Sequence, residues 1–185
     1  MVTSDVKDWL ALDVVMKDRY ILDWCKWTPS KCNIFLWRAE LNRIPTKVAL
    51  RQRNINIDST HCIFCEDMDE TTDRLFTGCA FSNGVWQGIS EWCNVPSIYA
   101  FKIQDLLELH KQIPGSDIKR NIFKGVIIVT CWRIWKARNE KLFANKICNV
   151  VEVVSDVKAY GFLWYRNRYK SDTIDWRKWC NFEFM

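Results

Sequence analysis

The sequence has 185 residues, which is long enough for one domain with a buried hydrophobic core. Hydrophobic residues make up 49% of it, including 11 Trp and 10 Phe, so the composition excludes an intrinsically disordered chain. Only 6 Gly and 4 Pro leave few turn signals, which disfavours a many-stranded fold, and the net charge of +5 is modest.

Helical patterns begin in the first quarter of the chain. Residues 1–23 form an N-terminal extension of weak periodicity, compatible with one helix or with a strand and a helix. A clearer helix should begin at a Ser30 cap and end before Pro45, because the residue before a proline disfavours helical geometry. Its predicted apolar stripe consists of Ile34, Phe35, Trp37, Leu41 and Ile44.

Further helices are predicted along the rest of the chain. Thr46 is the expected cap of a short helix, and the segment from Asp117 to about Asn145 is apolar on nearly every side, which is typical of a buried helix. The predicted helices after Pro45 cover residues 47–53, 81–92, 103–113, 117–145 and 149–169, and the aromatic tail 172–185 is predicted to be irregular. The expected fold is therefore mainly α, a small multi-helix domain with an embedded cysteine-rich, zinc-knuckle-like loop.

The sequence also bears on location. Its acidic start lacks the basic and apolar regions of a signal peptide, and its longest purely apolar run, residues 126–129, is too short to span a bilayer. Nine cysteines, an odd number, favour reduced thiols. We expect a protein of the nucleus or cytoplasm that is neither secreted nor bound to a membrane.

Positive charge is concentrated in one segment. Residues 26–53 hold seven basic residues and one acid, Glu40, for a local charge of +6. These cations could neutralise phosphates, and the nearby aromatic residues Trp27, Phe35 and Trp37 could stack on unpaired bases. The alternative is a solvated helix face over a buried aromatic stripe. The candidate nucleic-acid-binding residues are Lys31, Arg38, Arg43, Lys47, Arg51 and Arg53.

A second basic group, residues 133–141, follows the most apolar segment, where favourable interaction with a helix dipole could explain it.

Signatures of enzymes are missing: there is no glycine-rich phosphate loop, no nucleophile elbow and no compact Asp motif for two-metal chemistry. His110 is expected at a helix surface or boundary. The sequence therefore favours binding over catalysis.

Three cysteines have spacing suited to a metal. Cys62 and Cys65 are separated by two residues, as in a zinc knuckle, and Cys79 lies close enough to fold back toward them. A fourth His or Cys between Cys65 and Cys79 is missing. Position 74 is Arg74, whose guanidinium cannot ligate a metal.

These cysteines belong to a longer pattern, "KWTPSKCNIFLWRAELNRIPTKVALRQRNINI…HCIFC…ETTDRLFTGCAFSNGVW". It resembles the zinc-binding domain downstream of the reverse transcriptase in plant non-LTR retrotransposons, over about residues 24–92. The resemblance implies a reverse transcriptase zinc-binding-like domain at 24–95, followed by a C-terminal helical region at 96–185. It also implies zinc as cofactor and Cys62, Cys65 and Cys79 as ligands, with the family's histidine falling on Arg74.

Three outcomes for the metal remain open. His61 could supply a fourth ligand, a three-thiolate site could bind zinc together with water, or the loop could hold together without zinc through its apolar residues. The resemblance implies RNA or DNA as partner, bound mainly through phosphates, and the reverse transcriptase domain of a parent polyprotein. The rival interpretation is a structural or protein-interaction remnant that binds no nucleic acid.

Overall fold

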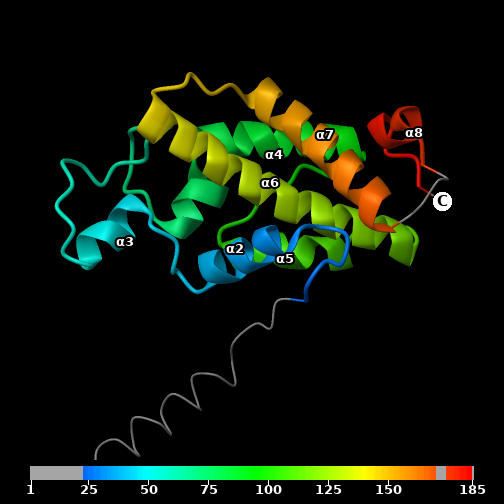
Figure 1. Ribbon diagram of the computed structural model, residues 1–185, viewed down its shortest axis with the longest axis horizontal. Helices are drawn as coiled ribbons and strands as arrows, with labels where there is room; N and C mark the ends of the chain where they lie inside the picture. Colours follow the sequence, from blue (N-terminus) through cyan, green and yellow to red (C-terminus); the bar gives the residue numbers. More distant parts are fainter. Residues whose placement is uncertain (1–22, 170–173, 185) are drawn as a thin grey trace, which may run out of the picture.

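The computed structural model describes residues 23–169 and 174–184 (Figure 1). These ranges are mainly helical and contain no β-strand, only an isolated antiparallel bridge between His61 and Asp69, so the predicted fold class is confirmed. The predicted element within residues 5–22 lies outside the described residues. The helices are α2 (Ser30–Glu40), α3 (Lys47–Gln52), the π-helical turn η1 (Arg74–Gly78), α4 (Ala80–Cys93), α5 (Ile103–Glu108), the 3-10 turn η2 (Leu109–Lys111), α6 (Asp117–Ala144), α7 (Val150–Tyr169) and α8 (Trp176–Cys180).

Helix α6 is the centre of the fold. In Figure 1 it crosses the molecule between α2 and α5 on one side and α4 and α7 on the other. Every residue from 122 to 131 is buried, as the apolar pattern predicts for a helix surrounded by others. The Ser116 hydroxyl caps this helix by accepting a hydrogen bond from the Lys119 amide at 3.2 Å. The predicted buried helix is confirmed.

Two glycines allow close packing, Gly88 between α4 and α7 and Gly125 between α6 and Trp27. A Cβ at Gly88 would lie 2.9 Å from Val154 Cγ2, and one at Gly125 of α6 would lie 2.0 Å from the Trp27 ring. These positions lack side chains because another element occupies the space. Although Gly weakens a helix, here it allows the close packing that stabilises the core.

The start and end of α2 differ from the prediction. The helix begins at Ser30 itself, with Pro29 at the cap position and no side-chain cap bond. It ends at Glu40, before Pro45 has any effect, because Asn42 adopts a left-handed φ of 53° and the Arg43 amide bonds back to the Arg38 carbonyl at 2.8 Å. Such a left-handed residue ends a helix in the usual way. Thr46 caps α3 as predicted.

The predicted apolar stripe of α2 is partly wrong. Ile34 and Trp37 are 43% and 42% exposed, whereas Leu36 and Ala39 are fully buried. Apolar character did not distinguish the buried face because large apolar residues occur all round this helix. Ile34 and Trp37 therefore lie at the protein surface and not in the core.

The tail is more regular than predicted. Asp175 caps α8 by accepting from the Lys178 amide at 2.8 Å, and Trp179 is completely buried among aromatic rings. One hydrophobic core extends from Cys25 to Phe182. The sequence ranges 24–95 and 96–185 therefore contribute to the same core, and their status as separate units stays a prediction. No helix of the described ranges has the length and apolar character needed to cross a membrane.

Candidate metal site and basic surface

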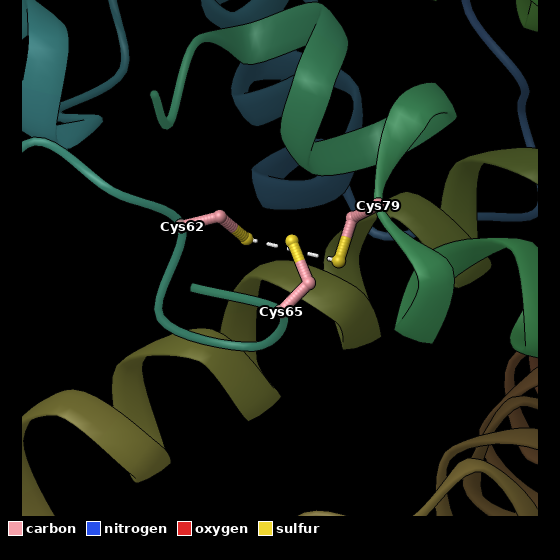
Figure 2. Close-up of side chains that lie close together, drawn as sticks. All are labelled: Cys62, Cys65 and Cys79. Atoms are coloured by element: carbon pink, nitrogen blue, oxygen red, sulfur yellow. Dashed lines mark hydrogen bonds between the residues drawn. The ribbon is translucent and has the colours of Figure 1, made fainter. Parts of the chain in front are cut away.

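The three predicted ligand cysteines converge in space. Cys62 and Cys65 come from the loop before η1, and Cys79 directly precedes α4 (Figure 2). Their sulfurs all lie within 4.8 Å of one another, and the Cys62 and Cys79 sulfurs are 3.7 Å apart. Two sulfurs bound to one tetrahedral zinc ion, each at about 2.3 Å, would be separated by about 3.8 Å. The cluster is thus compatible with a metal site.

A tight backbone turn sets this geometry. The Glu66 amide donates to the Cys62 carbonyl at 2.9 Å, and Glu66 itself adopts a left-handed φ of 56°, which is uncommon for a residue other than glycine. On the other side of the turn, the Cys62 amide donates to the Met68 carbonyl at 2.8 Å. These bonds bring Cys65 back toward Cys62.

Electrostatics within the cluster favour a thiolate at one position. The hydrogen bond with Cys79 lowers the pKa of the Cys62 thiol, whereas the same bond together with burial raises the pKa of Cys79. A zinc ion requires thiolates, so metal binding would release protons.

Arg74 occupies the edge of the cluster. Its Nη2 lies 3.8 Å from the Cys65 sulfur and 3.1 Å from an Asp67 carboxylate oxygen, while its Nε is buried without a hydrogen-bond partner. The side chain therefore extends from η1 to the Cys65 sulfur, one of the three sulfurs of the cluster. The three thiols could supply three ligands of a tetrahedral site, and the guanidinium beside Cys65 cannot supply the fourth.

His61 is not part of the cluster. Its side chain is exposed, and it does not join the three cysteines in the group of potential ligands. The backbone explains this, because His61 pairs with Asp69 across the bridge, and neighbouring residues of an extended segment point to opposite sides. The structure thus gives no support to His61 as the fourth ligand.

The cysteine loop is anchored by a buried ion pair that the sequence did not reveal. Arg138 of α6 holds Glu70 with Nη2 at 2.6 Å and Nε at 3.2 Å from one carboxylate oxygen, and both side chains are inaccessible to solvent. Glu70 also accepts from the Lys47 amide at the start of α3, at 3.0 Å. The acidic segment and the second basic group thus meet in the interior rather than at the surface.

A second anchor is aromatic. Phe64 of the loop stacks on Phe81 of α4 with ring centroids 4.0 Å apart, and the Lys141 ammonium lies 5.9 Å from the Phe64 ring. Leu75 and Phe76 of η1 are fully buried beneath it. The loop is therefore held by apolar contacts as well as by the ion pair, and which of the three outcomes for zinc applies stays a prediction.

The predicted basic residues lie along α2, the corner after it and α3. Lys47 is half-buried and the other five are exposed. None of the six forms an ion pair with another described residue, in contrast to Arg133 and Arg138 of α6, which are buried and paired. The candidate surface is hereafter called the basic surface and consists of Lys31, Arg38, Arg43, Lys47, Arg51 and Arg53.

The predicted stacking residues are mostly unavailable. Trp27 is completely buried, donates its indole N–H to the Asn121 carbonyl at 3.1 Å and packs edge-on against Tyr165. Phe35 is also buried, and of the three predicted rings only Trp37 is exposed. Two of these aromatic residues therefore belong to the core, as the alternative interpretation expected.

Residues 14–86 match the model of a family described as zinc-binding in reverse transcriptase. The match covers fewer than half of the 185 residues and includes all three cysteines of the cluster together with the basic surface. It confirms the resemblance to a reverse transcriptase zinc-binding domain. No curated protein and no solved structure matches the chain.

Proposed function

We propose that this reverse transcriptase zinc-binding region binds RNA or DNA through the basic surface. The observation that carries the proposal is a set of six cations without ion-pair partners among the described residues, on neighbouring elements. Unpaired Lys and Arg side chains that gather on one surface neutralise phosphates and release counterions. The binding is accordingly expected to depend strongly on salt and little on sequence.

We further propose a place for the chain in a parent protein. The sequence pattern resembles that of plant non-LTR retrotransposons, so the region would hold nucleic acid near the polymerase of a polyprotein and contact its reverse transcriptase domain. The matched family is not itself catalytic, which agrees with the missing enzyme signatures. Such a protein would act in the nucleus or cytoplasm, and the nine cysteines, all of which are free, fit a reducing compartment.

Zinc would have a structural role in this function. When bound, the ion would connect the cysteine loop to the start of α4 through Cys62, Cys65 and Cys79. The chain's own residues already position the loop by the contacts of Glu70 and Phe64. Zinc would therefore add a further link between the loop and the start of α4.

The salt dependence of binding tests the proposal. If four to six phosphates are contacted, a plot of log K against log salt concentration should have a slope of roughly −3 to −5, at about −0.7 to −0.9 per contact. Changing Arg43, Lys47 and Arg51 together to Ala should reduce the magnitude of the slope by about two to three. A labelled oligonucleotide and fluorescence anisotropy suffice for the measurement.

A matched control removes the same charge elsewhere. Arg166, Arg177 and Lys178 are exposed cations of α7 and α8, and α8 lies at the end of the molecule opposite α3 in Figure 1. Their combined change to Ala should leave the slope nearly intact. Equal slopes for the unmodified chain and the variant of the basic surface would contradict the proposal and favour the structural or protein-interaction remnant.

A further inference from the structure

A groove between α2 and α6 adjoins the basic surface. Its volume is about 570 Å³, within the range of roughly 300–1,000 Å³ that ligand pockets span. One face of α2 and one face of α6 form its two walls, and the corner between α2 and α3 closes one end. The residues that line it and matter for the argument are Lys31, Phe35, Arg38, Trp132, Asn139 and Phe143.

The walls are apolar and aromatic. Trp132 is only half-buried and meets Phe35 edge-on, with ring centroids 5.3 Å apart. Phe143 is 79% exposed at the groove, so its ring is accessible to a ligand there. An aromatic ligand could stack on these rings, whereas water would find few hydrogen-bond partners among them.

The polar groups of the groove are donors. Lys31 and Arg38 line it and are exposed, and no Asp or Glu lines it. The Asn139 oxygen accepts from Arg138 Nη1 at 3.0 Å, which leaves its NH2 group as the part able to bind a ligand. A matching ligand therefore combines a flat ring, hydrogen-bond acceptors and negative charge.

We propose that this groove holds an unpaired base of a single-stranded nucleic acid, stacked at Trp132 and Phe143, with the flanking phosphates at Lys31 and Arg38. The proposal rests on the proposed function and specifies its substrate as single-stranded. The Lys31 ammonium lies over the face of the Trp132 ring, 5.7 Å from its centroid, so a base that stacks on this face would move the ammonium aside toward its own phosphate. Bases in a duplex are stacked on each other and cannot enter the groove.

The charge of the groove selects this occupant over a helix from a partner protein. An amphipathic helix would cover the apolar walls, but it would meet the two cations only if it also carried acidic side chains opposite them. A base with its phosphates satisfies both features at once, as in other proteins that bind single strands by stacking and charge. A partner helix docked in the groove would therefore contradict the proposal.

The test compares paired substitutions at the stacking ring. Trp132→Leu removes the aromatic face and keeps apolar bulk, whereas Trp132→Phe keeps a face. The probe is a labelled oligo(dT) of about 12 nucleotides, within the site sizes of about 4–16 nucleotides known for such proteins, measured beside a duplex of equal length. Trp132→Leu should weaken oligo(dT) binding by about 5- to 150-fold, the range for loss of one stacking aromatic, and Trp132→Phe by much less.

Phe143→Ala extends the test to a side chain that folding does not require, because it is so exposed. It should weaken oligo(dT) binding about fivefold or more, while Phe101→Ala, which removes a 91% exposed ring outside the groove, should not. Neither substitution changes charge, so the salt slope should stay as in the unmodified chain.

The results distinguish this proposal from the proposed function. Unchanged oligo(dT) affinity in Trp132→Leu and Phe143→Ala, with a steep salt slope, would overturn the groove as a base site and leave the basic surface intact. Equal affinity for duplex and oligo(dT) would do the same. Failure of both probes to bind would overturn both proposals.

Discussion

Replacing Arg74 by histidine should create a complete zinc site. The Arg74 side chain leaves η1 toward the Cys65 sulfur, with its Nη2 at 3.8 Å, so an imidazole at this position would face the same three sulfurs. Histidine adds the fourth ligand and removes a permanent cation from beside the metal. We expect stoichiometric zinc in Arg74→His and well under one zinc per chain in the unmodified protein.

The substitution itself should change the metal-free protein little. The ion pair with Asp67 is partly exposed, and such pairs contribute about 0–1 kcal/mol. The buried Nε of Arg74, which has no hydrogen-bond partner, would be removed at the same time. Most of the effect should therefore come from zinc.

The size of that effect follows from mass action. Zinc that binds only the folded chain stabilises it by about 4.1 kcal/mol when its free concentration is about 1,000 times Kd. A gain of this size raises the Tm of a chain of this length by about 8–16 °C. At the same buffered zinc concentration, a site with Kd above that concentration gains less than about 0.4 kcal/mol, which raises the Tm by less than about 2 °C.

Circular dichroism gives the Tm of both proteins in buffered zinc and in the presence of a chelator. Metal analysis gives the number of zinc ions per chain. Arg74→Gln is the control, because it removes the cation without adding an imidazole. Full zinc in Arg74→Gln would mean that repulsion, rather than the missing ligand, weakens the site. Stoichiometric zinc in the unmodified chain that is lost in His61→Ala would refute the reasoning and show that His61 is the fourth ligand.

Three further predictions concern the core. Gly125→Ala should destabilise the protein by at least about 1–3 kcal/mol in a urea melt, because its Cβ would overlap the Trp27 ring; a neutral effect would show that this packing is wrong. Arg138→Met should cost about 3–5 kcal/mol, because it leaves the Glu70 carboxylate buried without its partner, and the double variant with Glu70→Gln should recover part of the loss. Trp132→Ala should cost less than about 3 kcal/mol, the lower limit for a fully buried large aromatic residue, because this ring is half-buried; a larger loss in the same melt would contradict the open groove.

The helices were predictable where periodicity was strong and caps were typical. The buried α6 and the Thr46 cap of α3 follow from local sequence. The buried face of α2 does not, because Ile34 and Trp37 are as apolar as the residues that pack inside. Only tertiary contacts decide which side of such a helix faces the core, and here α2 turns the buried side toward α6, against which it packs.

The sequence was sufficient to predict the three cysteines of the cluster, but not the ion pair that anchors their loop. The spacing of Cys62, Cys65 and Cys79 was sufficient to expect the convergence that the structure shows. The pairing of Glu70 with Arg138 joins residues 68 positions apart, and each looked like one more charge in a charged run. A single sequence carries no signal that two distant charges are buried together.

The buried ion pair explains how the basic surface can persist beside an incomplete metal site. Arg138 lines the groove, donates to Asn139 in it and holds Glu70 at the end of the cysteine loop. Glu70 in turn accepts from the first amide of α3, which carries part of the basic surface. The relative position of loop, α3 and groove is thus fixed by a contact that Arg74 does not touch. If the missing fourth ligand weakens zinc binding, as we predict, zinc would add little folding energy, but the cations and the groove would keep their places because their support comes from α6.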